Sequence, residues 1–219
     1  MDSKRREMSP RKSRLNPIKD VIFKFLVIGD YGVGKTAVVK MYTEGKFSSN
    51  YKTTIGADFS VKTILWDPST RVSVQLWDIA GHERFNFMTR AYYKYAVGCA
   101  IVFDATRHNT FISAKKWLQD LREKVVLDNG RDIPVVLLAN KWDIEEHGVT
   151  TTSITKFCKE NNILNWFPSS ARYNTNISEA IVCLIGAALE NIKPPVEPAP
   201  DVIKIEKSRK KSEKEPCCI

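Results

Sequence analysis

The sequence predicts an α/β fold of three layers, in which five helices flank a six-stranded and mostly parallel sheet. Apolar segments of strand length alternate with amphipathic segments of helix length along most of the 219 residues, a pattern typical of parallel strands packed between helices. An early pair of strand-like segments is instead joined by the short turn 67–70. Two strands joined so closely form a hairpin, which adds one antiparallel strand at the edge of the sheet.

The first half of the chain supplies one buried strand, one helix and the hairpin. The apolar run 23–28 predicts the strand, and residues 36–42 predict the helix that follows it. Residues 47–56 are polar and rich in turn-forming types, so we expect a loop there. The hairpin strands are 57–66, which alternates between apolar and polar residues, and 72–78.

The second half of the chain alternates more regularly between strands and helices. The continuous apolar runs 97–104 and 133–139 predict central parallel strands, because both faces of such strands are buried. Residues 110–126 carry apolar side chains at helical spacing, which gives one apolar face. The other predicted elements are a helix at 85–95, a helix at 152–161, a short strand near Trp166 and a helix at 176–192.

The two ends of the chain differ in composition from the domain that we place at residues 23–192. Residues 1–22 are polar and basic and contain Pro10 and Pro17, so we predict a disordered extension. Residues 193–219 begin with a proline-rich run and continue with lysine and glutamate, a composition typical of a flexible tail. No run approaches the 18 apolar residues of a membrane-spanning helix, so none is predicted.

Part of the net charge of +9 lies in these two ends. Such a distribution favours weak attraction to an anionic surface over a nucleic-acid-binding face, and no basic stripe interleaved with aromatic residues is present to stack bases. We therefore expect no nucleic-acid partner. The N-terminus lacks the apolar segment of a secretory signal peptide, so we expect a cytosolic chain.

The glycine-rich turn between the first strand and helix carries the clearest motif. Residues 29–36 fit G-x-x-x-x-G-K-[ST], the phosphate-binding P-loop, in the strand–turn–helix context that this motif requires. The glycines let backbone N–H groups close around an anion, and the helix N-terminus adds partial positive charge. Lys35 would reach the β- and γ-phosphates, and the Thr36 hydroxyl would bind Mg²⁺. The alternative interpretation is a structural glycine turn with a surface lysine.

Four further stretches occur in a fixed order, and we place each of them at the end of a predicted strand or near the last helix. Ligands of α/β sheets bind at the carboxyl ends of the strands, so we expect these stretches to meet the P-loop there. Each residue also has an ordinary structural interpretation, as a turn residue, a helix cap or a strand-end charge. The stretches are Thr54-Ile55-Gly56, Asp78-Ile79-Ala80-Gly81, Asn140-Lys141-Trp142-Asp143 and Ser169-Ser170-Ala171.

With these motifs the chain resembles the Ras superfamily of small GTPases over residues 23–192, and within it the Rab family. The resemblance to Rabs rests on the stretches 54–59 and 77–81 and on the paired tyrosines 92–93. Ile79, together with the stretches 66–68 and 138–141, is similar to the Rab branch that serves lysosome-related organelles. The resemblance implies a P-loop GTPase fold.

This resemblance also implies which residues bind the nucleotide. Asp143 would accept two N–H groups of guanine, a bidentate pair that adenine cannot form, while Asn140 would brace its loop and Lys141 would lie along the base. The Ala171 N–H would meet the guanine carbonyl, and Phe47 would pack edge-on against the base. The implied nucleotide-binding set comprises Gly29, Asp30, Tyr31, Gly32, Val33, Gly34, Lys35, Thr36, Ala37, Phe47, Thr54, Gly81, Asn140, Lys141, Asp143, Ser170, Ala171 and Arg172.

The implied cofactors are GTP or GDP and Mg²⁺. Thr36 would bind Mg²⁺ directly, Asp78 through water, and Thr54 only while the γ-phosphate is present. The N–H of Gly81 would bind that phosphate, so its loss on hydrolysis would release both loops. The implied catalytic residues are Lys35, Gly81 and His82.

Phe59, Trp77 and Tyr92 match the hydrophobic triad through which Rabs bind effectors. Exposed aromatic residues beside a switching loop serve well as interface anchors. The alternative is that these three residues belong to the core.

Two residues depart from the family pattern. His82 stands where the family has a glutamine that orients the attacking water, and Tyr31 replaces a small residue near the point where an arginine finger enters. We therefore predict a GTP hydrolase that is slow without an activating protein. The alternative is a nearly hydrolysis-deficient platform that is loaded with GTP by default. A P-loop ATPase or small-molecule kinase is a weaker alternative, against which the stretch 140–143 speaks.

The C-terminal stretch 216–219 is not a C-a-a-X signal, because its first residue is Pro216. It resembles the Rab tail in which paired cysteines, here Cys217 and Cys218, are both geranylgeranylated. Two lipid chains anchor a protein stably where one is marginal. The alternative is a pair of unmodified, exposed thiols.

The resemblance implies a set of partners and a location. The partners are an exchange factor, a GTPase-activating protein, a GDP-dissociation inhibitor or escort protein, a geranylgeranyl transferase, and effectors that bind the switch regions. The location is the cytoplasmic face of intracellular membranes, lysosome-related or endolysosomal, with cycling through the cytosol.

Overall fold

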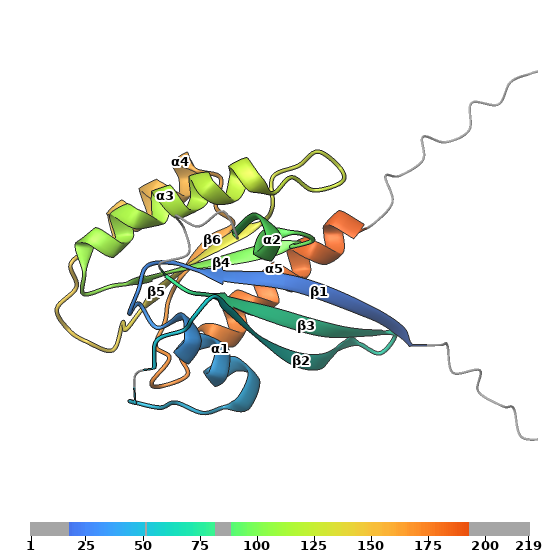
Figure 1. Ribbon diagram of the computed structural model, residues 1–219, viewed down its shortest axis with the longest axis horizontal. Helices are drawn as coiled ribbons and strands as arrows, with labels where there is room; N and C mark the ends of the chain where they lie inside the picture. The colour runs from blue at the N-terminus through green and yellow to red at the C-terminus, as the bar shows by residue number, and fades with distance from the viewer. Residues whose placement is uncertain (1–17, 51, 82–88, 193–219) are drawn as a thin grey trace, which may run out of the picture.

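A six-stranded sheet forms the centre of the computed structural model, which describes residues 18–50, 52–81 and 89–192 (Figure 1). The strands follow the order β2-β3-β1-β4-β5-β6, and only β2 and β3 run antiparallel to each other. The predicted fold class, with one antiparallel strand at the edge, is thus confirmed. The strands are β1 (Lys19–Ile28), β2 (Ala57–Asp67), β3 (Thr70–Ile79), β4 (Gly98–Asp104), β5 (Val135–Asn140) and β6 (Asn165–Pro168).

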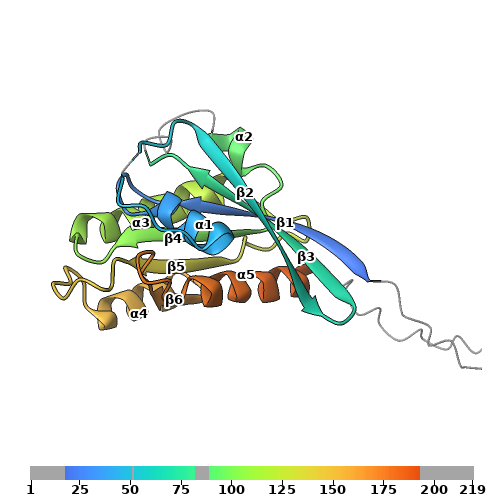
Figure 2. The ribbon, with the colours of Figure 1, turned by 90° about the horizontal axis from the view of Figure 1, so that it is seen from below.

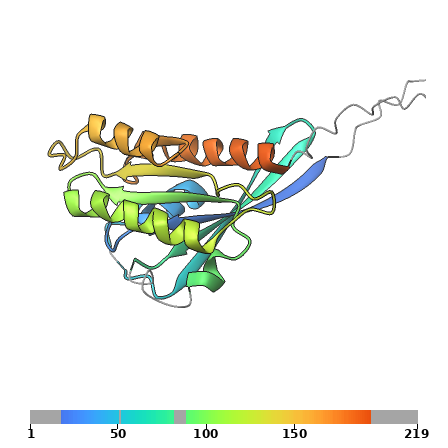
Figure 3. The same cartoon turned by 90° about the horizontal axis from the view of Figure 1, so that it is seen from above.

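Helices cover both faces of the sheet. Buried residues of α1 and α5 share one core cluster with the sheet, and those of α2, α3 and α4 share another. Figures 2 and 3 view the two sides, with α1 in front of the sheet in the first and α3 in front in the second. Within the described residues the five helices are α1 (Lys35–Glu44), α2 (Thr89–Tyr93), α3 (His108–Lys124), α4 (Thr151–Glu160) and α5 (Ile177–Ile192).

Strand β1 shows why these apolar runs become central strands. Phe23 and Phe25 point to the core beneath α1 and α5, whereas Leu26 and Ile28 point to the core beneath α3. Successive side chains of a strand face opposite sides of the sheet, so a strand with helices on both sides needs apolar residues at successive positions. β4 and β5 are buried along their whole length for the same reason.

Most element boundaries differ from the predicted ones by one to four residues, and three of these differences have a clear local cause. β1 begins at Lys19 rather than Phe23, because residues 19–22 pair with β3. The described part of α2 ends at Tyr93 rather than Tyr95, since Tyr95 has a left-handed backbone (φ 64°) that cannot continue a helix. The predicted start of that helix lies among residues 82–88, outside the described ranges.

The third difference concerns α3, which spans His108–Lys124 and so lies about two residues earlier than predicted. Val125 has an extended backbone (φ −129°) and closes the helix with its N–H on the Leu121 carbonyl. The apolar face that the sequence predicts is nevertheless present, with Trp117, Leu118 and Leu121 buried.

The parallel strands place their carboxyl ends along one edge of the sheet. β1, β3, β4, β5 and β6 run in the same direction, so the segments that follow them meet at that edge. These segments include the P-loop and the predicted stretches 78–81, 140–143 and 169–171. Among the helices of the described ranges, none is both long and apolar enough to cross a membrane.

Candidate nucleotide-binding site

The P-loop between β1 and α1 has a backbone that only glycine allows at two positions. Gly29 (φ 144°) lies so close to β4 that an added Cβ would stand 2.1 Å from the Val102 carbonyl oxygen. Gly34 (φ 97°) lies against Asn140, and an added Cβ would be 2.3 Å from its amide nitrogen. The sequence pattern of the motif therefore reflects close packing against two neighbouring strands.

Lys35 lies buried at the start of α1, with only 6% of its surface exposed. Its ammonium group donates hydrogen bonds to the carbonyl oxygens of Gly29 and Asp30, both at 3.0 Å. Burial lowers the pKa of Lys35 to about 8, and the nearby Asp78 and Asp30 carboxylates oppose that shift only in part. A cation that is so poorly solvated is prepared to bind an anion in the cleft.

Asp78, Thr36 and Thr54 converge beside Lys35. The Thr36 hydroxyl donates to Asp78 Oδ2, the Thr54 hydroxyl donates to the same oxygen at 3.4 Å, and the two hydroxyl oxygens are 2.9 Å apart. Burial raises the pKa of Asp78, and the hydrogen bond from Thr36 and the charge of Lys35 lower it by less.

This cluster fits a bound Mg²⁺ ion. Asp78 is 2% exposed, and its Oδ1 atom is buried with no hydrogen-bond partner in the protein. Buried polar atoms are seldom left unpaired, and Mg²⁺ prefers carboxylate and hydroxyl oxygens together with water and phosphate oxygens. The structure therefore brings together the residues that the sequence assigns to the metal, and Asp78 Oδ1 has no hydrogen-bond partner among the described residues.

The turn after β3 approaches the P-loop closely. A Cβ added to Gly81 would lie 2.3 Å from the Tyr31 amide nitrogen and 2.7 Å from Asp30. The structure therefore places Gly81 beside Asp30 and Tyr31 of the P-loop. His82, Cys217 and Cys218 lie outside the described residues.

Two connected cavities receive most of the predicted residues. The larger, of about 550 Å³, is lined by the P-loop, the start of α1, the loop 46–54 and Gly81. The smaller, of about 200 Å³, is lined by Asn140, Lys141, Asp143, Ala171 and Arg172. Both cavities share Gly34, Ala37 and Phe47 as lining residues. One continuous cleft thus joins the P-loop to the loops that follow β5 and β6.

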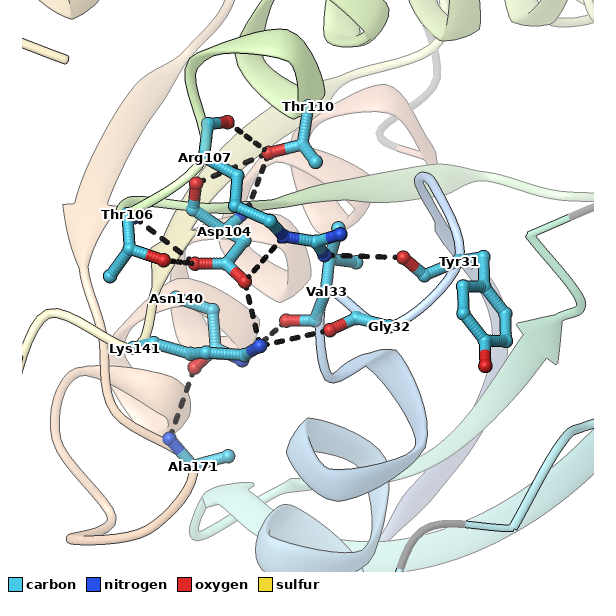
Figure 4. Close-up of polar contacts among 10 residues, drawn as sticks. All are labelled: Tyr31, Gly32, Val33, Asp104, Thr106, Arg107, Thr110, Asn140, Lys141 and Ala171. Atoms are coloured by element: carbon cyan, nitrogen blue, oxygen red, sulfur yellow. Dashed lines mark hydrogen bonds and ion pairs between the residues drawn. The ribbon is translucent and has the colours of Figure 1, made fainter. Parts of the chain in front are cut away.

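Asn140 and Lys141 tie the loop after β5 to the P-loop (Figure 4). The Asn140 side chain, 1% exposed, donates to the Val33 carbonyl at 2.8 Å and accepts from the Ala171 N–H at 3.1 Å. The Lys141 ammonium donates to the Gly32 carbonyl at 3.0 Å. The smaller cavity is therefore held in shape by direct bonds between three loops.

Asp143 is exposed and lines the wall of this smaller cavity, and one of its carboxylate oxygens is held by a hydrogen bond. The buried Ser170 hydroxyl donates to Asp143 Oδ1 at 2.6 Å and accepts from the Tyr173 N–H at 3.2 Å. A carboxylate accepts several hydrogen bonds at once, so Asp143 retains acceptor capacity for two N–H groups on a ligand. Guanine presents two adjacent N–H groups on one edge, and adenine does not.

Asp104 at the end of β4 and its partner Arg107 belong to this region, although no sequence motif predicted them. The Asp104 carboxylate is 2% exposed and pairs with Lys141 at 2.6 Å and with Arg107 at 2.9 Å. The available signal was a lone acidic residue that ends a continuous apolar strand. Such a carboxylate arrives at the ligand-binding edge of the sheet.

The three aromatic residues of the predicted triad lie on neighbouring elements. Phe59 and Trp77 pair across β2 and β3, and their rings stack with centroids 5.7 Å apart. Phe59 is 58% exposed and so does not belong to the core. Tyr92 is half-buried on α2, and its hydroxyl lies near Gly56 in the loop before β2.

Comparison with known proteins places this geometry in context. The pattern described as the Ras family matches residues 24–190. The chain is 48% identical to the Ras-related protein Rab-32B of Dictyostelium discoideum over 92% of this chain and 79% of that protein. It is 47% identical to the human Ras-related protein Rab-32 over 91% of each chain, and 45% identical to the human Ras-related protein Rab-7L1 over 79% of this chain and 85% of that protein.

Proposed function

We propose, because the chain belongs to the Ras family of small GTPases and within it to the Rabs, that the cleft binds GTP and Mg²⁺ through the residues described above. One observation carries this proposal. Asn140, Lys141 and Asp143 form a guanine-sized cavity that shares its wall with the P-loop cleft. Binding of phosphate alone, or of an adenine nucleotide, does not require a cavity formed by these three residues.

The residues of the cleft divide the work between base and phosphates. Asp143 accepts the two guanine N–H groups, and the Ala171 N–H donates to the guanine carbonyl. Lys35 supplies positive charge at the β- and γ-phosphates. Thr36, Thr54 and Asp78 would hold Mg²⁺, which when bound neutralises charge on the phosphates.

Thr54 and Gly81 make the site a switch. Thr54 lies in the loop before the β2–β3 hairpin and Gly81 in the loop after it, and each would contact the γ-phosphate of bound GTP. When hydrolysis removes that phosphate, both loops lose a contact, and the neighbouring surface of Phe59, Trp77 and Tyr92 changes with them. Effectors that bind this surface would then distinguish the GTP form from the GDP form.

We propose that intrinsic GTP hydrolysis, which resets this switch, is slow. His82 offers an imidazole where a glutamine amide would both donate to and accept from the attacking water, and Tyr31 lines the cleft beside Gly81. A single-turnover measurement of GTP hydrolysis on the purified protein tests this, with His82→Gln as the comparison. We expect the variant to be faster, and equal rates would contradict slow hydrolysis.

A default GTP-loaded platform is the second candidate, favoured by the same two residues, Tyr31 and His82. The nucleotide carried by the protein isolated from cells distinguishes the two candidates. Mostly GDP favours a switch that an activating protein resets, and mostly GTP favours the platform.

We further propose that Cys217 and Cys218 carry two geranylgeranyl groups and anchor the chain to the cytoplasmic face of endolysosomal or lysosome-related membranes. The C-terminal sequence and the similarity to Rab-32 and Rab-7L1 support this. An exchange factor, an activating protein, a dissociation inhibitor and effectors would control the cycle. Imaging of the tagged full chain with and without Cys217→Ser and Cys218→Ser tests the anchor, and unchanged membrane association would contradict it.

A further inference from the structure

Four consecutive P-loop residues are held by side chains from outside the loop. Each of residues 30–33 accepts a hydrogen bond from a side chain outside the loop, two of these bonds coming from the α3 region and two from the end of β5 and the residue after it. The bonds are Trp117 Nε1 to Asp30 Oδ1 (2.8 Å), Arg107 Nη2 to the Tyr31 carbonyl (3.2 Å), Lys141 Nζ to the Gly32 carbonyl (3.0 Å) and Asn140 Nδ2 to the Val33 carbonyl (2.8 Å).

Asp104 links two of these four donors (Figure 4). Its Oδ2 atom accepts from Arg107 Nε at 2.9 Å and from Lys141 Nζ at 2.6 Å, and its Oδ1 atom accepts from the backbone and hydroxyl of Thr106. Burial alone would raise the pKa of Asp104, but Lys141, Thr106 and Arg107 together hold it below its usual range. One ionised carboxylate oxygen thus pairs with both cations.

Arg107 is the residue that joins this carboxylate to the P-loop backbone. Its guanidinium binds Asp104 through Nε and the Tyr31 carbonyl through Nη2, and a planar fork can hold two acceptors in fixed directions. The main chain of Arg107 is fixed at the start of α3, where its carbonyl accepts from the Thr110 hydroxyl at 2.8 Å. The Arg107 side chain is nonetheless 46% exposed, so its removal leaves little of the core disturbed.

We infer that Arg107 is a positioning residue for the bound nucleotide. Through Asp104 and Lys141, Arg107 holds the P-loop against the guanine-binding loop and thereby slows nucleotide release. The nucleotide spans both loops, so it leaves when they separate or loosen. Each tie that must break first lowers the rate of release. This inference rests on the proposed guanine-nucleotide site.

The test measures release of a fluorescent GDP analogue from the full-length protein with Mg²⁺ present, after addition of excess unlabelled GDP. We expect Arg107→Ala to release the analogue about three- to tenfold faster, the range that corresponds to one hydrogen bond. The lysine of Arg107→Lys can still pair with Asp104 but cannot also reach the Tyr31 carbonyl. We therefore expect its release rate to lie between those of the wild type and Arg107→Ala.

Arg122→Ala is the matched control, because Arg122 lies on the same helix and pairs with Asp132 and the Asn161 carbonyl away from the cleft. Its release rate should equal that of the wild type. The melting temperature of each GDP-bound protein separates positioning from loss of fold. Arg107→Ala should melt within a few degrees of Arg122→Ala, because the Arg107 side chain is half-exposed and the buried Asp104 carboxylate keeps its ion pair with Lys141.

Two results would overturn the inference. One is release from Arg107→Ala within twofold of the wild type. The other is equally fast release from Arg107→Ala and Arg107→Lys, with melting temperatures well below that of the control, because general loosening then explains the rates. A wild-type protein that retains no GDP would instead contradict the proposed function itself, and the inference with it.

Discussion

At the scale of single residues, the cleft contains two buried charges whose pKa values are shifted toward the neutral forms. Burial lowers the pKa of Lys35 and raises that of Asp78. Both side chains are less than 10% exposed, and their mutual attraction does not offset the loss of solvent. A phosphate beside Lys35 and a divalent cation beside Asp78 would restore the charged forms. A bound magnesium–nucleotide complex would thus supply the opposite charges that the ionised forms of Lys35 and Asp78 lack.

Proton uptake on nucleotide binding follows from the pKa of Lys35. Burial lowers the pKa of Lys35 in the folded protein to about 8, from the ordinary lysine value of 10.5. Below pH 8 Lys35 is charged and the full desolvation penalty opposes folding. Between about pH 8 and 10.5 the unfolded chain binds the extra proton, so the contribution of this group to stability rises with pH. Phosphate favours the charged ammonium, so GDP binding at pH 8 should take up about half a proton.

Calorimetric titration of GDP in two buffers of different ionisation enthalpy at pH 8 measures this uptake. Lys35→Arg is the control, because a guanidinium stays charged at that pH. Uptake that is absent from the wild type, or equal in both proteins, would show that Lys35 is already protonated in the free cleft.

Asp78→Asn should uncouple nucleotide retention from Mg²⁺. An amide keeps the shape but loses the charge, so we expect the Mg²⁺ concentration that half-maximally slows GDP release to rise on the order of 10–100-fold. Chelation of the metal should speed release from the wild type strongly and from the variant little. Because Asp78 has a raised pKa, its replacement should not destabilise the nucleotide-free protein.

Asp58→Asn is the matched control for this variant. Asp58 lies directly opposite Asp78 in the β2–β3 pair but is exposed. A Mg²⁺ dependence that changes equally in both variants would attribute the effect to general charge rather than to a ligand.

At the scale of elements, the first residues of β1, 19–22, contribute to stability although they precede the predicted domain. Lys19 donates its N–H to the Ser69 carbonyl at 2.7 Å, and Val21 is buried against the core. Residues 1–17 have the polar, basic composition of disordered segments, so their deletion should leave the unfolding free energy unchanged. Deletion of residues 1–22 should lower it by roughly 2–4 kcal/mol, from one buried valine and a few ladder hydrogen bonds.

Urea unfolding of both truncated proteins, with GDP and Mg²⁺ at the same excess concentrations, compares them directly. The Asp20–Arg71 ion pair is exposed and should contribute little. Equal stabilities for the two truncations would mean that residues 19–22 contribute nothing as part of β1.

Periodicity predicted the type of every strand and helix but not all of their ends. Lys19 and Asp20 are charged and follow a polar stretch, so only pairing with β3 reveals that they belong to a strand. The end of α2 depends on the left-handed backbone of Tyr95, which no apolar pattern records. Long apolar runs such as β4 and β5 were predictable because burial on both faces leaves a continuous signal.

The same division holds for the site. Lys35, Asp78 and Asn140 could be placed at the cleft from the sequence because each stands in a short motif at a strand end, while their roles in binding stay predictions. Asp104 and Arg107 could not be placed there, since their partners Tyr31 and Lys141 lie far away in sequence. Only the fold brings these residues together.

At the scale of the whole molecule, the sheet joins two halves of one ligand site. β1 and β3 lead to the P-loop and Gly81 in the larger cavity, and β5 and β6 lead to the loops that line the smaller one, at the same edge of the sheet. A ligand that spans both halves stabilises the folded chain in proportion to the logarithm of its concentration. Under the proposed function, nucleotide binding, global stability and the state of the surface around Phe59, Trp77 and Tyr92 would therefore be coupled through one cleft.

Nucleotide selectivity of the purified full-length protein tests the central claim most directly. A bound fluorescent GDP analogue is displaced by GTP, GDP or ATP in the presence of Mg²⁺, with Asp143→Asn measured alongside. We predict that GTP and GDP compete at least about a thousandfold better than ATP, because a site built around a hydrogen-bonded edge rejects a base that lacks it. The Asp143→Asn variant should lose most of that preference. Displacement by ATP at the same concentration as GTP would contradict a guanine-nucleotide switch.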